Sequence, residues 1–370
     1  MAKTIIIGAG PAGLAVAASL KQLGHDAILL ERTEHIGAAW HKHYDRLHLH
    51  TPKGSSALPY LPFPKSYPRY ISREQFVTYL ETYVQHFELK PELGQDVQRA
   101  YVEDGLWQVE TTAQRYSSDF LVVATGNTRT PRRPHWEGLE RFTGDALHSS
   151  EYKNGSTLKG KKVLVVGFGN SGGEIALDLF EHGAMPFISV RSPVNVIPRD
   201  LFGIPIVSIA IAVSKLPPRL SDTLTAPVLS LIYGNVGKLG FQKQGYGSLE
   251  QIKQTSRIPF IDIGTMAHIR AGDISVRPAI RSFGDRDVTF ADGQKEAVDA
   301  VVLATGYCPA ITSFLETPFD SLDEMGRPRQ SGVQLAKGLF YCGYYVAATG
   351  MLREIAIEAK RIAKSIGQQS

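Results

Sequence analysis

The stretch that decides the fold is Lys3-Thr-Ile-Ile-Ile-Gly-Ala-Gly-Pro-Ala-Gly13, near the start of the chain. Its apolar, β-branched run predicts a short buried strand, and the apolar spacing from Pro11 to Leu23 predicts a helix. The three glycines fit the GxGxxG pattern, which permits a tight turn, close approach of the backbone to a pyrophosphate, and close packing of helix on strand. The next predicted strand, Asp26 to Glu31, ends on an acid that is placed to accept hydrogen bonds from ribose hydroxyls. We therefore expect a dinucleotide-binding unit of the FAD type here.

A second copy of the same plan begins in the middle of the chain. Lys161 to Gly167 predicts the strand, Gly167-Phe-Gly-Asn-Ser-Gly172 is the glycine motif, and Asn170 to Glu181 predicts the helix. The strand that follows ends on Arg191, where the first unit has its acid, and Ser192 comes next. Because an arginine suits a 2′-phosphate, the second site is predicted to prefer NADPH over NADH. Two dinucleotides held by one chain predict hydride transfer from one to the other.

Composition limits the remaining possibilities. With 370 residues the chain is long enough for two domains, and its net charge of +4 gives no sign of a nucleic-acid-binding patch. The only two cysteines, Cys308 and Cys342, exclude a disulfide framework and a CxxC pair, which suits a reducing compartment. The first predicted strand begins so early that no room is left for a signal peptide. We therefore expect a cytoplasmic protein.

The longest apolar stretch, Leu201 to Val213, is too short to span a bilayer and contains Pro205. No integral membrane segment is therefore expected. We expect the stretch to be buried, and the alternatives are that it lines a substrate entry or touches a membrane surface.

The order of the elements predicts a discontinuous first domain. Strands that end in Ala-Thr-Gly occur twice, at 120–126 and at 300–306, and a strand at 339–343 precedes a last helix at 350–366. The predicted fold is α/β, with two Rossmann-like domains. The FAD-binding domain comprises 1–157 and 304–370, and the NADPH-binding domain, 158–303, is inserted into it. Within the first domain, Ser72-Arg-Glu-Gln75 predicts a capping box at the start of a helix with an apolar stripe.

A motif between the two glycine patterns carries a family resemblance. Residues Phe142 to Tyr152 match FxGxxxHxxxY, the identifying motif of class B flavin-containing monooxygenases, and Ala304-Thr-Gly-Tyr307 resembles that family's ATGY. Within the family the chain most resembles the YUCCA branch, in segments 44–53, 61–64, 79–83, 262–264 and 269–272. The resemblance implies an NADPH- and O2-dependent monooxygenase that works through a C4a-(hydro)peroxyflavin. It further implies oxidative decarboxylation of a 2-keto acid such as indole-3-pyruvate. N- or S-oxygenation of small amines or sulfides, and uncoupled NADPH oxidation, stay open.

The resemblance also assigns roles to single residues. His50 stands where the N- and S-oxygenating branch usually has Asn and the YUCCA branch has His. This implies a proton or hydrogen-bond partner of the oxygenating flavin, and a packing histidine is the alternative. Trp40 occupies the family's flavin-contacting Leu-Trp position, with Ala39 in place of Leu. His148 belongs to the family motif and is expected near NADP, although a purely structural role is equally open.

The candidate site residues follow from these patterns and from the resemblance. The residues expected to contact FAD are Gly8, Ala9, Gly10, Pro11, Ala12, Gly13, Glu31, Arg32, Trp40, Val97, Ala124, Thr125, Gly126 and Gly343. Those expected to contact NADP are Gly167, Phe168, Gly169, Asn170, Ser171, Gly172, Arg191 and Ser192, with His148 from the motif. No metal is expected, since no cysteine or acid completes a ligand set with the histidines at 41–50. The partners are a small-molecule substrate and O2, and the oligomeric state is left open.

Overall fold

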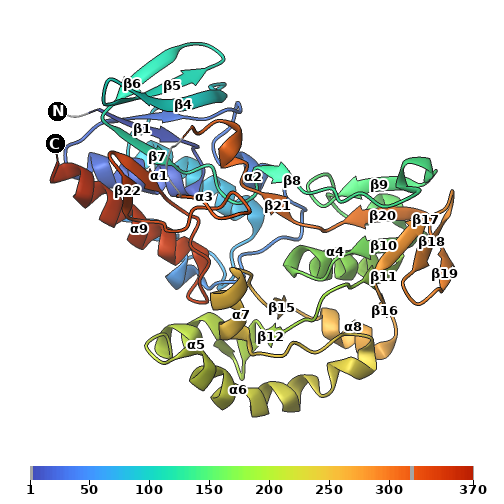
Figure 1. Ribbon diagram of the computed structural model, residues 1–370. Helices are drawn as coiled ribbons and strands as arrows, with labels where there is room; N and C mark the ends of the chain where they lie inside the picture. Colours follow the sequence, from blue (N-terminus) through green and yellow to red (C-terminus); the bar gives the residue numbers. More distant parts are fainter. Residues whose placement is uncertain (1–2, 317–320, 370) are drawn as a thin grey trace. The chain divides into compact units, whose positions relative to one another are not determined.

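The computed structural model describes residues 3–316 and 321–369 (Figure 1). The chain forms two compact units. The first unit comprises residues 1–42, 51–130 and 307–370, and the second comprises 43–50 and 131–306. These units group residues by proximity of the backbone. The predicted limits of the two cofactor domains, at 157/158 and 303/304, remain a prediction.

The first unit is built on a six-stranded sheet in the order β22-β23-β7-β1-β2-β3. All neighbours are parallel except β22, which runs antiparallel to β23. β1 and β7 are buried along their whole length, as apolar runs in the middle of a parallel sheet should be. The strands are β1 (Thr4–Ile7), β2 (Ala27–Leu30), β3 (Pro91–Glu92), β7 (Phe120–Val123), β22 (Gln334–Ala336) and β23 (Leu339–Tyr341).

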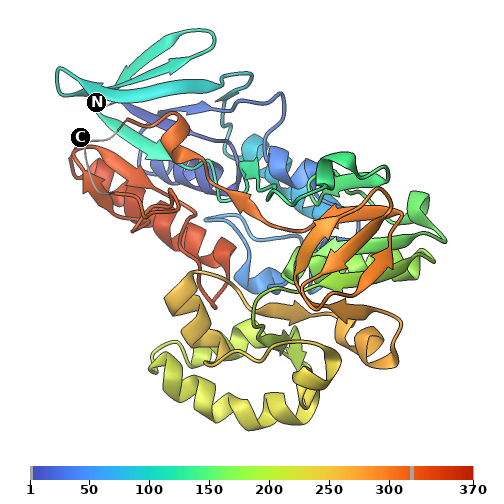
Figure 2. The same ribbon diagram turned by 45° about the vertical axis from the view of Figure 1, so that its right-hand side comes forward.

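Helices of the first unit pack close to this sheet. α1 (Pro11–Lys21) lies beside α9 (Met351–Gly367), as Figures 1 and 2 both show. α2 (Ala38–Lys42) precedes α3 (Arg73–His86), which begins with the predicted capping box: Ser72 and Gln75 exchange both hydrogen bonds. A separate antiparallel sheet consists of β4 (Val97–Glu103), β5 (Leu106–Thr111) and β6 (Arg115–Ser118).

The second unit has a five-stranded parallel sheet in the order β16-β11-β10-β20-β9. α4 (Asn170–Glu181) follows β10 with the bounds that the sequence predicts, and its apolar face packs on the sheet. The strands are β9 (Asp145–His148), β10 (Lys162–Val166), β11 (Met185–Ser189), β16 (Ser275–Arg277) and β20 (Ala300–Leu303). An antiparallel three-stranded sheet follows β16 in the chain. Its strands are β17 (Ile280–Phe283), β18 (Asp287–Phe290) and β19 (Lys295–Ala297).

Smaller elements complete the chain. α5 (Ile206–Ala212), α6 (Pro218–Tyr233), α7 (Ser248–Thr255) and α8 (Thr265–Ala271) follow one another in the second unit. Three two-stranded sheets join β12 (Val196–Pro198) to β15 (Phe260–Asp262), β13 (Asp200–Leu201) to β14 (Ile204–Pro205), and β8 (Thr130–Pro131) to β21 (Tyr307–Cys308).

Two parallel sheets with helices on them confirm the predicted α/β fold class. One expectation is wrong: the apolar stretch 201–213 is not buried, since Val207 is its only buried residue. The stretch is split between a hairpin and the short helix α5, and its other residues are half-buried or exposed. None of the helices that the structure describes is both long and apolar enough to cross a lipid bilayer.

Candidate functional site

The first glycine turn has the geometry of a dinucleotide cradle. Gly8 has φ +104°, and a Cβ on it would lie 2.7 Å from the carbonyl oxygen of Ala124. A Cβ on Gly13 would lie 1.9 Å from the oxygen of Gly8, so α1 can pack this closely only with glycine there. A Cβ on Gly10 would meet no atom within 4 Å in the described part of the chain. Gly10 therefore opens the backbone toward a ligand, and the turn fits a pyrophosphate.

The start of α1 is suited to phosphate in a second way. Among the described residues no side chain hydrogen-bonds to the N-terminal N–H groups of α1, and Pro11 occupies the first helical turn. Free N–H groups and the helix dipole both favour an anion at this end. The residues between the glycines, Ala9 and Ala12, are buried and fix the turn against the sheet.

Glu31 lies directly after β2, beside the turn. Its carboxylate is buried and accepts the N–H of Ala9 at 2.9 Å and that of Thr33 at 3.1 Å. Oε1 also accepts the Thr33 hydroxyl at 2.9 Å, whereas Oε2 accepts only the Ala9 N–H among the described residues, so Oε2 keeps a lone pair for a ribose hydroxyl. The next residue, Arg32, is exposed, and its guanidinium donates to the carbonyl oxygen of Arg129 at 3.3 Å.

Other predicted flavin residues come together around the same turn. Ala124 closes it from the end of β7, and Gly343, with φ +85°, approaches Ala12 so closely that an added Cβ would lie 2.8 Å from its methyl carbon. Trp40 is joined to the turn through Gly37, whose N–H donates to Ala9 and whose oxygen accepts from the Trp40 N–H. Three others lie at strand ends: Val97 is buried at the start of β4, the Thr125 hydroxyl lies 2.8 Å from that of Tyr344, and Gly126 has φ +73°.

A buried acid on α9 supports this group and escaped the sequence analysis. Glu358 accepts the Gly343 N–H at 2.7 Å and the Ser331 hydroxyl at 2.8 Å. Burial raises the pKa of Glu358, and it also raises the pKa of the Cys342 thiol beside it. An acid that lies on the apolar face of a predicted helix is the signal that would have found it, because a buried carboxylate needs partners.

The second glycine turn repeats the geometry of the first. Gly167 has φ +103°, and a Cβ on it would lie 2.7 Å from the oxygen of Ala304, while one on Gly172 would lie 2.1 Å from the oxygen of Gly167. Gly169 is open, like Gly10. No described side chain caps the start of α4. This turn too fits a pyrophosphate.

The neighbours of the second turn are positioned by packing. The ring centroids of Phe168 and Phe260 lie 4.3 Å apart with the ring planes tilted by 42°, and the side-chain oxygen of Asn170 accepts the Ile261 N–H at 2.8 Å. Ser171 is half-buried. Both aromatic and amide contacts tie the turn to the strand β15.

Arg191 and Ser192 follow β11 and are exposed. The Arg191 guanidinium makes no hydrogen bond or ion pair with any residue that the structure describes. A guanidinium without a protein partner is available to an added phosphate. Binding of a 2′-phosphate by Arg191 and Ser192 stays a prediction.

The family-motif histidine is buried and doubly held. Nδ1 of His148 accepts the N–H of Ser150 at 3.1 Å, so Nε2 carries the proton, 3.1 Å from the carbonyl oxygen of Gly306. Burial lowers the pKa of His148, which keeps the ring neutral. These contacts join the end of β9 to the segment after β20. A contact of His148 with NADP remains a prediction.

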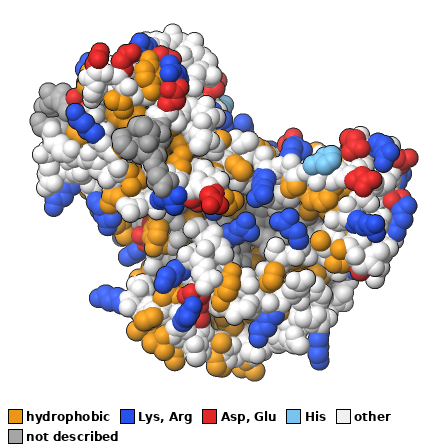
Figure 3. Space-filling model, viewed as in Figure 1, with side chains coloured by type: hydrophobic (Ala, Val, Ile, Leu, Met, Phe, Trp, Pro, Cys, Tyr) orange, Lys and Arg blue, Asp and Glu red, His pale blue; other side chains and the backbone are white. Residues whose placement is uncertain are grey.

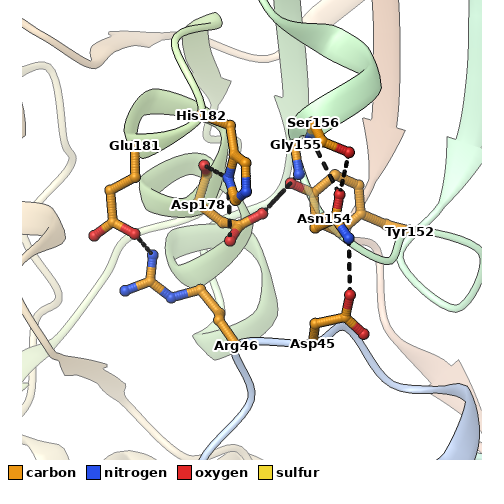
Figure 4. Close-up of polar contacts among 9 residues, drawn as sticks. All are labelled: Asp45, Arg46, Tyr152, Asn154, Gly155, Ser156, Asp178, Glu181 and His182. Atoms are coloured by element: carbon orange, nitrogen blue, oxygen red, sulfur yellow. Dashed lines mark hydrogen bonds and ion pairs between the residues drawn. The ribbon is translucent and has the colours of Figure 1, made fainter.

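The motif's last residue, Tyr152, is anchored to α4 (Figure 4). Its hydroxyl donates to Asp178 at 2.5 Å, and the same carboxylate oxygen accepts the Gly155 N–H at 2.9 Å. Both side chains are buried, and burial together with the bond to Asp178 raises the pKa of Tyr152. The tyrosine is therefore a neutral donor to the carboxylate of Asp178.

Segment 43–50 is tied to the same helix. Arg46 donates to Glu181 at 2.7 Å, and Asp45 accepts from Asn154 at 2.8 Å (Figure 4). At the end of the segment, Nε2 of His50 lies 2.5 Å from the carboxylate of Glu174, which is 1% exposed. This short contact between ring and carboxylate fixes the orientation of the imidazole and leaves Nδ1 as the other ring nitrogen. Sequence reasoning singled out His50 but missed Glu174.

Two such glycine turns, each between a parallel strand and a helix, are typical of dinucleotide-binding folds. The sequence profile of the family described as Flavin-binding monooxygenase-like matches residues 1–341, and the chain belongs to this family. Flavin is accordingly its cofactor and monooxygenation its class of reaction.

Individual relatives agree with this assignment. The chain is 42% identical to indole-3-pyruvate monooxygenase YUCCA1 of Oryza sativa subsp. japonica over 327 residues, which cover 87% of this chain and 80% of that protein. It is 39% identical to probable indole-3-pyruvate monooxygenase YUCCA4 of Arabidopsis thaliana over 371 residues, 99% of this chain and 90% of that protein. A flavin-containing monooxygenase from Stenotrophomonas maltophilia shares the fold, with a TM-score of 0.75 at 21% identity over 100% of this chain and 99% of that one. The predicted YUCCA-like resemblance is confirmed.

Proposed function

We propose that the chain is an FAD-containing, NADPH- and O2-dependent monooxygenase that decarboxylates a 2-keto acid such as indole-3-pyruvate. The observation that carries the proposal is the pair of complete glycine turns, the first followed by a buried acid and the second by an exposed arginine. The 2-keto acid is inferred from the relatives, which match almost the whole chain and are named indole-3-pyruvate monooxygenases.

The first unit would hold FAD. The open backbone at Gly10 and the start of α1 would bind the pyrophosphate, and Glu31 would bind the ribose. When bound, the flavin supplies hydride acceptance and the activation of O2. The chain's own part is to orient the ring system, for which Gly343 and its support Glu358 are placed.

The second unit would hold NADPH. Gly169 and the start of α4 would bind its pyrophosphate, while Arg191 and Ser192 would bind the 2′-phosphate. A guanidinium forms charge-assisted, bidentate hydrogen bonds with phosphate, which a ribose hydroxyl cannot match. This residue pair would therefore separate NADPH from NADH.

His50 would move a proton at Nδ1. Its Nε2 is engaged by Glu174, so Nδ1 is the ring nitrogen that would take up a proton and return it to an oxygen of the substrate. Glu174 is in this proposal a positioning residue, which orients the imidazole and stabilises its charged form. A hydrogen-bonded carboxylate behind a histidine has this effect in acid–base catalysis generally.

The test is an assay of the purified protein. NADPH oxidation, O2 consumption and product are measured with and without indole-3-pyruvate. We expect faster NADPH oxidation and formation of indole-3-acetate with the release of carbon dioxide. If neither appears, the substrate is wrong. Trimethylamine and a thioether, tested alongside, detect N- or S-oxygenation, and hydrogen peroxide as the sole product with every substrate would identify an oxidase.

A further inference from the structure

Residues 202–231 present an unusually exposed apolar surface, which we call the apolar face. Phe202 and Leu231 are each 83% exposed, and Leu224 is 63% exposed. Ile204, Leu216 and Leu220 are also exposed. Figure 3 shows hydrophobic side chains gathered over α5 and α6, with lysines and arginines among them. Single exposed apolar residues are ordinary, but a group of them on successive elements points to a binding surface.

Phe202 is unfavourable in its backbone conformation as well as in its exposure to solvent. It forms the tip of the hairpin between β13 and β14, with φ +49°, and Gly203 beside it has φ +81°. A two-residue turn with positive φ at both positions strongly prefers Asn-Gly, because left-handed backbone is unfavourable for an aromatic residue. A phenylalanine that is both strained and exposed at a hairpin tip therefore points to a contact that it makes outside the chain.

The two helices continue the apolar face. Six of the seven residues of α5 are apolar, yet only Val207 is buried. On α6 the exposed residues Leu220, Leu224, Pro227 and Leu231 recur at three- and four-residue spacing, which places them in one stripe. A helix that shows apolar residues to solvent needs a second apolar phase to cover them.

The charge of residues 201–261 indicates which apolar phase covers the apolar face. Residues 201–261 contain six lysines and arginines but only two acids, Asp222 and Glu250. Asp222 accepts the N–H groups of Leu249 and Glu250, and the buried Glu250 forms an ion pair with one of the six cations, Arg219, at 3.4 Å. The four net positive charges of this segment equal the net charge of the whole chain, +4. Exposed apolar side chains in a segment of net positive charge are complementary to an anionic lipid surface.

We propose that the apolar face docks in the plane of an anionic phospholipid membrane, with Phe202 and the stripe of α6 inserted among the acyl chains. The second unit would thus be a peripheral membrane module, whatever substrate the enzyme oxidises. A second copy of the chain suits this face less well, because a two-fold interface would set the same cations against one another.

The experiment is vesicle flotation of the full-length protein. Vesicles of phosphatidylcholine alone are compared with vesicles of equal parts phosphatidylcholine and phosphatidylserine, at low and at physiological salt. We expect association with the phosphatidylserine vesicles only, weakened by salt because the cations contribute through screened attraction.

Matched variants assign the association to the apolar face. Phe202→Asn removes the aromatic ring and suits the left-handed turn, so it should fold at least as well as the wild type. Together with Leu231→Ser it should lower vesicle binding at least tenfold. Leu23→Ser with Val102→Ser, which replaces two exposed apolar residues in the first unit, should leave binding unchanged. Lys215→Glu with Lys238→Glu should abolish binding, while Lys90→Glu, also exposed, should not.

The opposite results overturn the proposal. These are no flotation with either vesicle, or equal loss of binding in the face variants and in the Leu23/Val102 control. A concentration-dependent dimer in light scattering, absent from the Phe202→Asn, Leu231→Ser variant and accompanied by no vesicle binding, would assign the face to a second copy. Circular dichroism and flavin content, measured for every variant, show that a loss of binding is not a loss of fold.

Discussion

Replacing Tyr152 by phenylalanine removes one hydroxyl from the buried contact with Asp178 and leaves the ring in the core of the second unit. The lost bond is short, 2.5 Å, and its acceptor is a carboxylate. Hydrogen bonds to charged groups contribute about 1.5–3 kcal/mol. Because Asp178 keeps the Gly155 N–H at 2.9 Å, its carboxylate is not left without a donor. We therefore expect a loss of about 2 kcal/mol in the free energy of unfolding.

The opposite truncation should cost more. Asp178→Ala leaves the Tyr152 hydroxyl and the Gly155 N–H buried without their acceptor, and each orphaned group costs about 1–3 kcal/mol. We expect a total of about 3–5 kcal/mol. In the double variant the hydroxyl is gone, so only one donor is orphaned. The double variant should therefore lose less unfolding free energy than the sum of the two single losses. We expect a coupling energy of about 1–2 kcal/mol.

The assay is urea unfolding followed by circular dichroism, with both single variants and the double variant measured together. Tyr101→Phe is the matched control, because its hydroxyl also binds a carboxylate, Glu110 at 2.9 Å, but in a sheet open to solvent. It should leave the midpoint near that of the wild type. The reasoning fails if Tyr152→Phe costs under about 0.5 kcal/mol, or if the two single losses are fully additive.

Three further substitutions test the candidate site. Gly13→Ala should give a protein without flavin, because its Cβ would lie 1.9 Å from a backbone oxygen, whereas Gly10→Ala should fold normally and only bind flavin more weakly; absorbance and melting temperature separate the two. Arg191→Ala should raise the KM for NADPH roughly tenfold to a hundredfold and leave that for NADH unchanged, and equal changes for both would remove the 2′-phosphate from this residue. Glu174→Gln should lower kcat and change the pH dependence of kcat, as His50→Gln should, with the KM for NADPH unaltered. A loss in kcat with the wild-type pH profile would leave Glu174 a purely structural role.

The glycine turns were predictable because their requirements are local. Only glycine is possible at Gly8, where φ is positive, and at Gly13, where the helix packs against the strand and turn. The glycine pattern in the sequence therefore indicates this geometry directly. The same holds for the capping box at Ser72, whose two hydrogen bonds join residues three apart. The fold class follows, since two such units imply two parallel sheets.

The contacts of the site were not predictable, because each joins residues far apart in sequence. His50 and Glu174 are separated by 124 positions, and an acid within a helix is ordinarily taken as a solvated charge. The exposure of 201–213 was missed for a related reason. Apolar composition predicts burial only if another layer covers the segment, and no local pattern states whether one does.

Three of the contacts that sequence reasoning missed involve acids of one helix, α4. Its acids Glu174, Asp178 and Glu181 recur at four- and three-residue spacing and so lie in one row along the helix. The three bind His50, Tyr152 and Arg46 in turn. The N-terminus of α4 forms the second glycine turn, and its side anchors both the family-motif tyrosine and the segment that ends in His50. A shift of α4 would therefore move the proposed NADPH cradle and His50 together.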